Sequence, residues 1–224
     1  MVRSILLGVF LAFATLAVAS GLYVFSVYKK IQSGEIAYED LFTADAKDVS
    51  RAVEGSGRPF IGNEDAPAVF VEFVDFECPY CRESAEVIRQ IMLEPYYQDK
   101  VRFVFRHFPV MELHPNALDA AMAAECAHEQ NMFWEMHNAI FEIQDSLSVP
   151  ELKKAGVKIG LDSVQFSECV DSYKYLDVIE DDFNDGIFFR IQSTPSFVVN
   201  GRIIEGTPTF SGMKSAIDAI LMNK

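Results

Sequence analysis

The chain has 224 residues, half of them hydrophobic, and a formal net charge of −14 at neutral pH. This length and composition provide enough apolar surface for a substantial core and exclude a disordered chain. Residues 1–30 carry three basic side chains and no acidic one, which leaves a net charge of −17 on the remainder. Such an acidic domain repels the phosphates of nucleic acids, so no nucleic-acid partner is expected.

An uncharged apolar run occupies residues 5–27. About 20 apolar residues cross the hydrocarbon core of a bilayer as a helix, so residues 1–30 are predicted to be an N-terminal transmembrane anchor. The small-x-small sequence at residues 17–19 leaves a second interpretation open, in which the segment is a signal sequence and the mature protein is secreted. The polar residues 31–58 are predicted to be a spacer.

A folded domain is predicted from residue 59 to residue 222. Ala68–Phe76 is rich in Val and Phe, which is typical of a buried strand. Arg82–Leu93 has the apolar spacing of a helix, and Lys100–Phe108 alternates as a second strand. A strand, a helix and a parallel strand form a βαβ unit.

A helical insertion is predicted at about residues 112–190. Pro115–Gln144 is expected to be one long helical stretch. Pro150–Ile191 is expected to supply further helices, with breaks near three glycines: Gly156, Gly160 and Gly186.

The chain is predicted to finish with a hairpin and a helix. Ser196–Asn200 and Arg202–Ile204 are the expected strands, and Asn200-Gly201 is a strong two-residue hairpin turn. Thr209–Met222 has the pattern of an amphipathic helix. The expected order is therefore βαβ, an all-helical insertion, and ββα.

Cys78 and Cys81 lie where the first predicted strand runs into the first predicted helix. A C-x-x-C sequence is typical either of half a zinc site or of a redox pair. The other two cysteines stand alone and the four histidines share no ligand spacing, so no metal is expected. A helix N-terminus favours a thiolate at Cys78, and the thiolate is the attacking species in disulfide exchange. Pro79 suits the first helical turn, and Cys81 can close back on Cys78.

Several segments together resemble the thioredoxin-like DsbA family. The resemblance extends over about residues 59–222, and the segments that carry it are Phe60–Pro67, Glu72–Cys81, Arg106–Pro109, Phe133–His137 and Ser193–Gly201. The resemblance implies an α/β thioredoxin-like fold with an inserted helical subdomain. It also implies an enzyme that exchanges disulfides with cysteine-containing exported proteins and needs no further cofactor.

The resemblance assigns roles around the cysteine pair. It implies that Pro195 is cis and that Thr194 faces the active site, so that both shape the substrate groove. The alternative is an ordinary trans proline at the start of an edge strand. Pro79 and Tyr80, between the cysteines, are expected to tune the reduction potential, with Cys78 as the exposed attacking sulfur.

Glu72 lies six residues before Cys78, where the resemblance places a buried acid beneath the disulfide. A buried carboxyl has a raised pKa and could take the proton from Cys81 during exchange. The alternative is a solvated acid on an edge strand.

Cys126 and Cys169 both lie in the helical insertion. In an oxidising compartment they are expected to form a structural disulfide, as some members of the resembled family do. Two buried free thiols are the alternative.

Disulfide exchange on exported proteins indicates a domain in the periplasm or outside the cell. The resemblance also suggests a membrane quinone-linked partner. We expect a disulfide-forming oxidase, with a reductase or an isomerase as alternatives. A non-catalytic binding or chaperone module is an alternative of another class.

Overall fold

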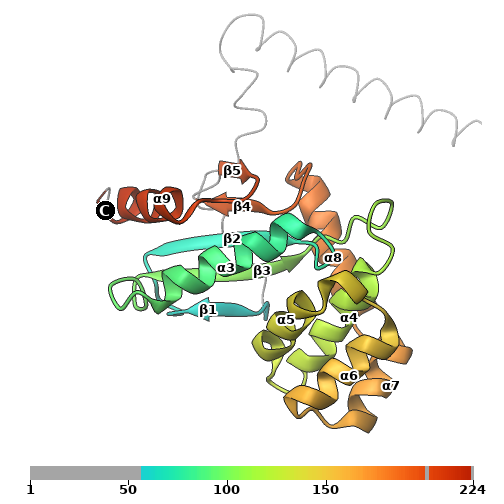
Figure 1. Cartoon of the computed structure of the whole chain (residues 1–224). Coiled ribbons are helices and arrows are strands. Elements are labelled where there is room, and N and C mark those ends of the chain that lie inside the picture. Colours follow the sequence, from blue (N-terminus) through green and yellow to red (C-terminus); the bar gives the residue numbers. More distant parts are fainter. Residues whose placement is uncertain (1–56, 200–201, 223–224) are drawn as a thin grey trace, which may run out of the picture. The chain divides into compact units, whose positions relative to one another are not determined.

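The computed structural model describes residues 57–199 and 202–222 (Figure 1). The predicted anchor at residues 1–30, nearly all of the predicted spacer and the predicted Asn200-Gly201 turn lie outside these ranges. Within them, no helix combines the length and the apolar composition that a membrane crossing requires.

The described residues form one mixed sheet with the strand order β1-β3-β2-β4-β5. Its strands are β1 (Phe60–Gly62), β2 (Ala68–Val74), β3 (Val101–His107), β4 (Ser196–Val199) and β5 (Arg202–Glu205). β2 and β3 are parallel, and the other neighbouring pairs are antiparallel. The predicted βαβ and ββα units are therefore confirmed. β1 was not predicted; it pairs with β3 and places Phe60 opposite Val104.

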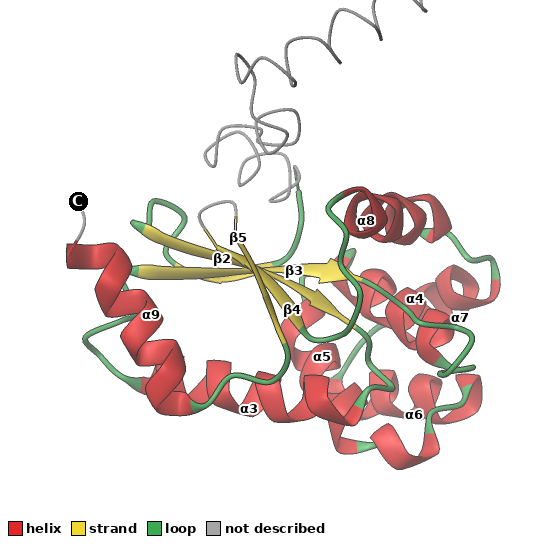
Figure 2. Ribbon diagram, turned by 90° about the horizontal axis from the view of Figure 1, so that it is seen from above, coloured by secondary structure: helices red, strands yellow, loops and turns green. Residues whose placement is uncertain are grey.

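Helices cover both faces of this sheet (Figure 2). α3 (Pro79–Leu93) and α9 (Phe210–Met222) lie against one face, and α8 (Leu176–Phe188) lies against the other. β2 is buried on both faces, which explains its nearly continuous apolar sequence. Phe70 packs with the α3 and α9 side chains, and Phe73 packs with the opposite cluster. The burial pattern of β2 thus follows from its place at the centre of a three-layer arrangement.

All the helices between β3 and β4 belong to the inserted part of the chain (Figure 1). They are α4 (Ala117–His128), α5 (Phe133–Glu142), the 3-10 turn Gln144–Ser146, α6 (Val149–Ile159), α7 (Ser163–Asp171) and α8. The long helical stretch predicted at Pro115–Gln144 is mainly helical, but it is divided into two helices, α4 and α5. The chain breaks between α4 and α5, where Asn131 adopts a left-handed conformation with φ of 59°. Asn tolerates that conformation better than most residues.

The three glycines expected to break helices behave differently from one another. Gly160 ends α6 with φ of 95°, as predicted. Gly156 and Gly186 instead lie inside α6 and α8, which end three and two residues after them, at Ile159 and Phe188. A Cβ at Gly156 would come within 2.5 Å of the Phe166 ring, and one at Gly186 would come as close to Phe108. Both glycines therefore permit close packing of an aromatic ring.

The insertion has its own core, which a disulfide crosses. Cys126 on α4 and Cys169 on α7 are bonded, with Cα atoms 5.8 Å apart. Both belong to a buried apolar cluster that also contains Phe105 on β3 and Phe76, which follows β2. The alternative of two free thiols is therefore wrong for this pair.

Polar contacts also join the insertion to the sheet. Asp182 on α8 is fully buried and accepts from Arg106 at 2.5 Å and from Arg58 at 2.6 Å. The indole N–H of Trp134 on α5 donates to the carbonyl oxygen of Phe60 on β1 at 2.8 Å. A buried carboxylate needs such partners, so Asp182 fixes α8 against β3.

Candidate active site

The two cysteines lie at the beginning of α3. The helix starts at Pro79, three residues earlier than predicted, and Cys78 is its N-cap residue. The N–H of Cys81 donates to the carbonyl oxygen of Cys78 at 3.1 Å. Both side chains are free thiols. Cys78 is the more exposed of the two, but at 5% exposure it is far less open to solvent than expected, while Cys81 is 1% exposed.

The surroundings shift the pKa values of the two thiols in opposite directions. A hydrogen bond from the Cys81 thiol lowers the pKa of Cys78 to about 6, assisted by Thr194 and by the N–H groups of Cys81 and Tyr80. Burial, together with the neighbouring Cys78 and Glu72, raises the pKa of Cys81 well above its usual value. At neutral pH the pair therefore contains one thiolate and one thiol, which is the charge state that disulfide exchange requires.

The loop before β4 reaches the same point from more than a hundred residues away in the sequence. The Thr194-Pro195 peptide bond is cis, so the alternative of a trans proline is wrong. Sγ of Cys78 lies 3.4 Å from the carbonyl oxygen of Thr194 and donates to it when Cys78 is protonated. Tyr80 is 59% exposed beside the pair, and its carbonyl oxygen accepts from Thr207 at 3.4 Å. The structure thus brings together Cys78, Cys81, Thr194 and the exposed dipeptide between the cysteines.

Glu72 lies on β2, behind α3. It is 5% exposed, and its carboxyl accepts a hydrogen bond from the Ser84 hydroxyl at 2.5 Å. Burial raises the pKa of Glu72 to about 8, although the bond from Ser84 opposes the shift. Because β2 lies between β3 and β4, the alternative of a solvated acid on an edge strand is wrong.

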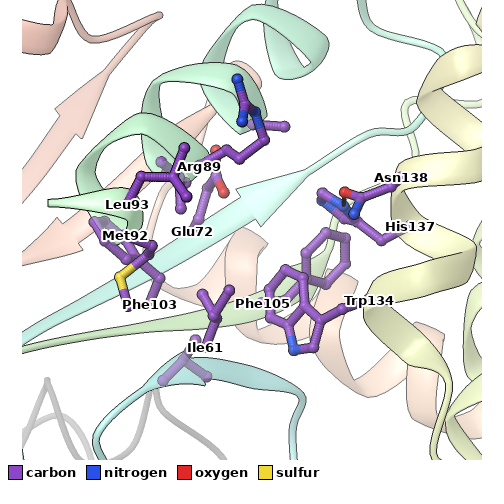
Figure 3. A pocket seen from close by; sticks show the side chains of 13 residues that line it. Ile61, Glu72, Arg89, Met92, Leu93, Phe103, Phe105, Trp134, His137 and Asn138 are labelled. Atoms are coloured by element: carbon purple, nitrogen blue, oxygen red, sulfur yellow. Dashed lines mark hydrogen bonds between the residues drawn. The ribbon is translucent and has the colours of Figure 1, made fainter. Parts of the chain in front are cut away.

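A cavity of about 260 Å³ adjoins Glu72 (Figure 3). Its walls are mainly apolar and come from α3, β1, β3 and α5, with Trp134 and His137 facing α3 across the opening. Burial lowers the pKa of His137 to about 4, so this wall carries no positive charge at neutral pH. The cavity gives the carboxyl of Glu72 a route to solvent that does not pass through the cysteines.

Asp75 lies in the Glu72–Cys81 segment, but no role in the site was predicted for it. This residue is 1% exposed and lies between β2 and Cys78. Its carboxylate accepts from the N–H of Glu77 at 2.8 Å, from the N–H of Val110 at 2.7 Å and from the His114 ring at 2.9 Å. Its own N–H donates to Sγ of Cys81 at 3.5 Å.

Two further polar residues hold the loop that contains the cysteines. Gln144, just after α5, donates to the carbonyl oxygens of Phe76 and Cys78 at 2.8 and 2.9 Å. Glu77 accepts from the backbone and side-chain nitrogens of Asn116 at 2.7 and 3.0 Å. These partners are distant in the sequence and follow no motif, so only the fold reveals them. No group of three candidate metal ligands occurs in the part of the chain that the structure describes.

The comparison with protein families decides the identity of the chain. The profile of a family described as Thioredoxin matches residues 55–219. The chain belongs to the thioredoxin family.

Solved structures resemble this thioredoxin-family chain over most of its length. BdbD from Bacillus subtilis, in its oxidised form, is 25% identical; the match covers 74% of this chain and 94% of that one, with a TM-score of 0.67. The thiol-disulfide exchange protein alpha-DsbA2 from Wolbachia pipientis is 19% identical, with 83% and 98% covered and a TM-score of 0.68. The resemblance to DsbA-like proteins, and with it the assignment to an oxidoreductase family, is confirmed.

Curated relatives share this domain within longer proteins. The Na(+)/H(+) antiporter NhaA 3 of Salinispora tropica is 35% identical over 156 residues, which are 70% of this chain and 24% of that protein. The thioredoxin-family chain spans about a quarter of the length of the curated relatives it matches.

Proposed function

We propose that the protein is an extracytoplasmic thiol–disulfide oxidoreductase that forms disulfides in cysteine-containing exported proteins. The observation that carries this proposal is the pair of free thiols at the start of α3, with opposite pKa shifts and the cis Thr194-Pro195 loop beside them. A non-catalytic binding module would need neither the second cysteine nor the lowered pKa of Cys78.

In the oxidising direction, a substrate thiolate attacks Sγ of Cys78 in the Cys78–Cys81 disulfide. The Cys78–Cys81 bond breaks, and its electron pair leaves on Cys81. A second substrate thiolate then attacks the substrate sulfur of the mixed disulfide and releases Cys78 as a thiolate. The substrate gains one disulfide and the protein gains two reduced sulfurs, so electrons balance. The low pKa of Cys78 makes it a good leaving group and stabilises the reduced protein, which favours this direction.

Glu72 is the proposed proton carrier for Cys81. With a pKa of about 8, its carboxyl is mostly protonated at neutral pH, and its charge influences Cys81. It can protonate Cys81 as that sulfur leaves and take the proton back when the disulfide is formed again. The adjoining cavity supports proton exchange with solvent.

The location and partners follow from the chemistry and the resemblance. The Cys126–Cys169 disulfide is stable in an oxidising compartment, which supports a domain in the periplasm or outside the cell. Residues 1–30 would tether it there as an anchor, or would be removed as a signal sequence. Reoxidation would use a membrane quinone-linked partner. Thr194 and Pro195 would bound the substrate groove, and Pro79 and Tyr80 would tune the potential.

The test is the equilibrium reduction potential of Cys78–Cys81, titrated against glutathione with the Cys78→Ser variant as the baseline. A value near about −120 mV is expected, because it belongs to oxidants whose reduced form is stabilised. A value near about −270 mV would contradict the oxidase and favour the alternative of a reductase. A protein that reaches no redox equilibrium with glutathione would contradict the exchange activity itself.

A further inference from the structure

Asp75 connects the two cysteines to a loop that follows β3. Its carbonyl oxygen accepts from the N–H of Cys78 at 3.1 Å, and its N–H donates to Sγ of Cys81 at 3.5 Å. This N–H belongs to the Val74–Asp75 peptide unit, whose carbonyl oxygen accepts from the N–H of Phe108 at 2.8 Å. The orientation of that unit determines whether a donor points at the buried sulfur.

The side chain of Asp75 is fully buried, and its hydrogen bonds hold the Cα atom next to this N–H. Its Oδ2 atom accepts both from the N–H of Val110 and from Nδ1 of His114. His114 is held in turn, because its N–H donates to the carbonyl oxygen of Val110 at 2.9 Å and its carbonyl oxygen accepts from Ala117 at 3.2 Å. Without His114, only the N–H groups of Glu77 and Val110 would hold this buried carboxylate, which leaves it under-satisfied.

Negative charge develops on Sγ of Cys81 in both directions of exchange. When a substrate thiolate opens the Cys78–Cys81 disulfide, the electron pair leaves on Cys81. In the reverse step the Cys81 thiolate attacks Cys78 in the mixed disulfide, and the substrate leaves as a thiolate. Burial and the charges of Cys78 and Glu72 disfavour the charge on Cys81, whereas the N–H of Asp75 favours it. A hydrogen bond from the N–H of Asp75 to Sγ of Cys81 therefore stabilises the developing charge in either direction of exchange.

We infer that His114 is a positioning residue for the exchange reaction: through its hydrogen bond to Asp75 it holds the N–H of Asp75 on Sγ of Cys81. This inference rests on the proposed exchange activity. It assigns a role to a histidine that touches neither cysteine and lies 33 positions beyond Cys81 in the sequence.

The experiment separates attack at Cys78 from the reaction of Cys81. The full chain is charged with glutathione on Cys78, and the lifetime of this mixed disulfide is measured by acid quenching and mass spectrometry. The rate of Cys78 alkylation is measured in parallel. His114→Ala is expected to lengthen the lifetime roughly tenfold, as for the loss of one hydrogen bond to a charged group, with Cys78 alkylation unchanged.

Two variants make the result specific. His114→Asn keeps a side-chain N–H near the position of Nδ1 and is expected to stay within about twofold of wild type. Glu112→Ala, an exposed change in the same loop, is expected to have no effect. If His114→Ala does not fold, Asp75→Asn tests the same contact from its other side and should lengthen the lifetime in the same way.

Three results would overturn the inference. The first is a mixed-disulfide lifetime in His114→Ala equal to that of the wild type. The second is an equally long lifetime in His114→Asn and His114→Ala. The third is a slower alkylation of Cys78 in His114→Ala. If the wild type itself resolves the mixed disulfide no faster than a Cys81→Ser variant, the proposed function fails together with the inference. The two failures are therefore distinguishable.

Discussion

Cys78 and Cys81 are separated by two residues at the start of one helix, whereas Cys126 and Cys169 lie 43 positions apart on α4 and α7. Burial does not distinguish the pairs, because the four residues are 5%, 1%, 1% and 4% exposed in that order. The difference lies in their surroundings. All four cysteines belong to the same buried apolar cluster. Cys78 and Cys81 also receive hydrogen bonds from backbone and side-chain groups, whereas Cys126 and Cys169 are bonded to each other. Polar contacts, and not exposure, mark the reactive pair.

The largest expected effect is the loss of exchange when the reactive pair is broken. Cys78→Ser should lower the rate of disulfide exchange on a peptide substrate by on the order of 10³-fold or more, as expected when a nucleophile is removed. Thermal stability should change little. Retention of the wild-type rate would show that Cys78 is not the attacking sulfur.

Removing the Cys126–Cys169 disulfide should lower stability and leave exchange activity intact. The double variant Cys126→Ala, Cys169→Ala opens a loop with a sequence separation of 43, which predicts a loss of about 4 kcal/mol in unfolding free energy. Exchange activity should persist at temperatures where the variant remains folded. Denaturant titration with a parallel activity assay measures both quantities, and lost activity in a folded sample would contradict the separation of roles.

Glu72→Gln should alter the pH dependence of stability. Burial raises the pKa of Glu72 to about 8, so the folded protein keeps a proton that the unfolded chain releases near pH 4.5. Between these values the unfolded state binds fewer protons, and the stability of the wild type must fall as pH rises. Relative to the wild type, the unfolding free energy of the variant should therefore rise from about zero at pH 4 to roughly 4 kcal/mol at pH 8. Urea titrations across this range test the slope; a pH-independent difference would contradict it.

The smallest effect is expected from overpacking the insertion. Gly156→Ala places a Cβ within 2.5 Å of the Phe166 ring on α7, the helix that carries Cys169. We expect a loss of about 1–2 kcal/mol, since better helix propensity offsets part of the strain. The reduction potential of Cys78–Cys81 should not move. Lys154→Ala, an exposed change on the same helix, is the control and should be near neutral.

The sequence was informative where local pattern determines structure. The β-rich run before Cys78, the apolar spacing after it and the alternation of Lys100–Phe108 were sufficient for the βαβ unit. β1 escaped prediction because it has three residues without clear alternation. The break at Asn131 and the tight packing at Gly186 depend on contacts between helices, which a local pattern does not contain.

The same limit applies to the candidate site. The two cysteines, Glu72 and Thr194 could be named from spacing and resemblance. Asp75 and His114 could not be linked, because 39 positions separate them and His114 lies in none of the segments that carry the resemblance. The membrane anchor, the direction of electron flow and the redox partner stay predictions.

Trp134, the single tryptophan of the chain, bonds to the backbone of β1 and lines the cavity beside Glu72. Intrinsic fluorescence excited at the indole band therefore comes from one known place, the contact between the insertion and the sheet. An emission change on reduction or on binding would report movement at that contact without an added label. The fluorescence of this native tryptophan thus reports on the packing of the helical insertion against the sheet.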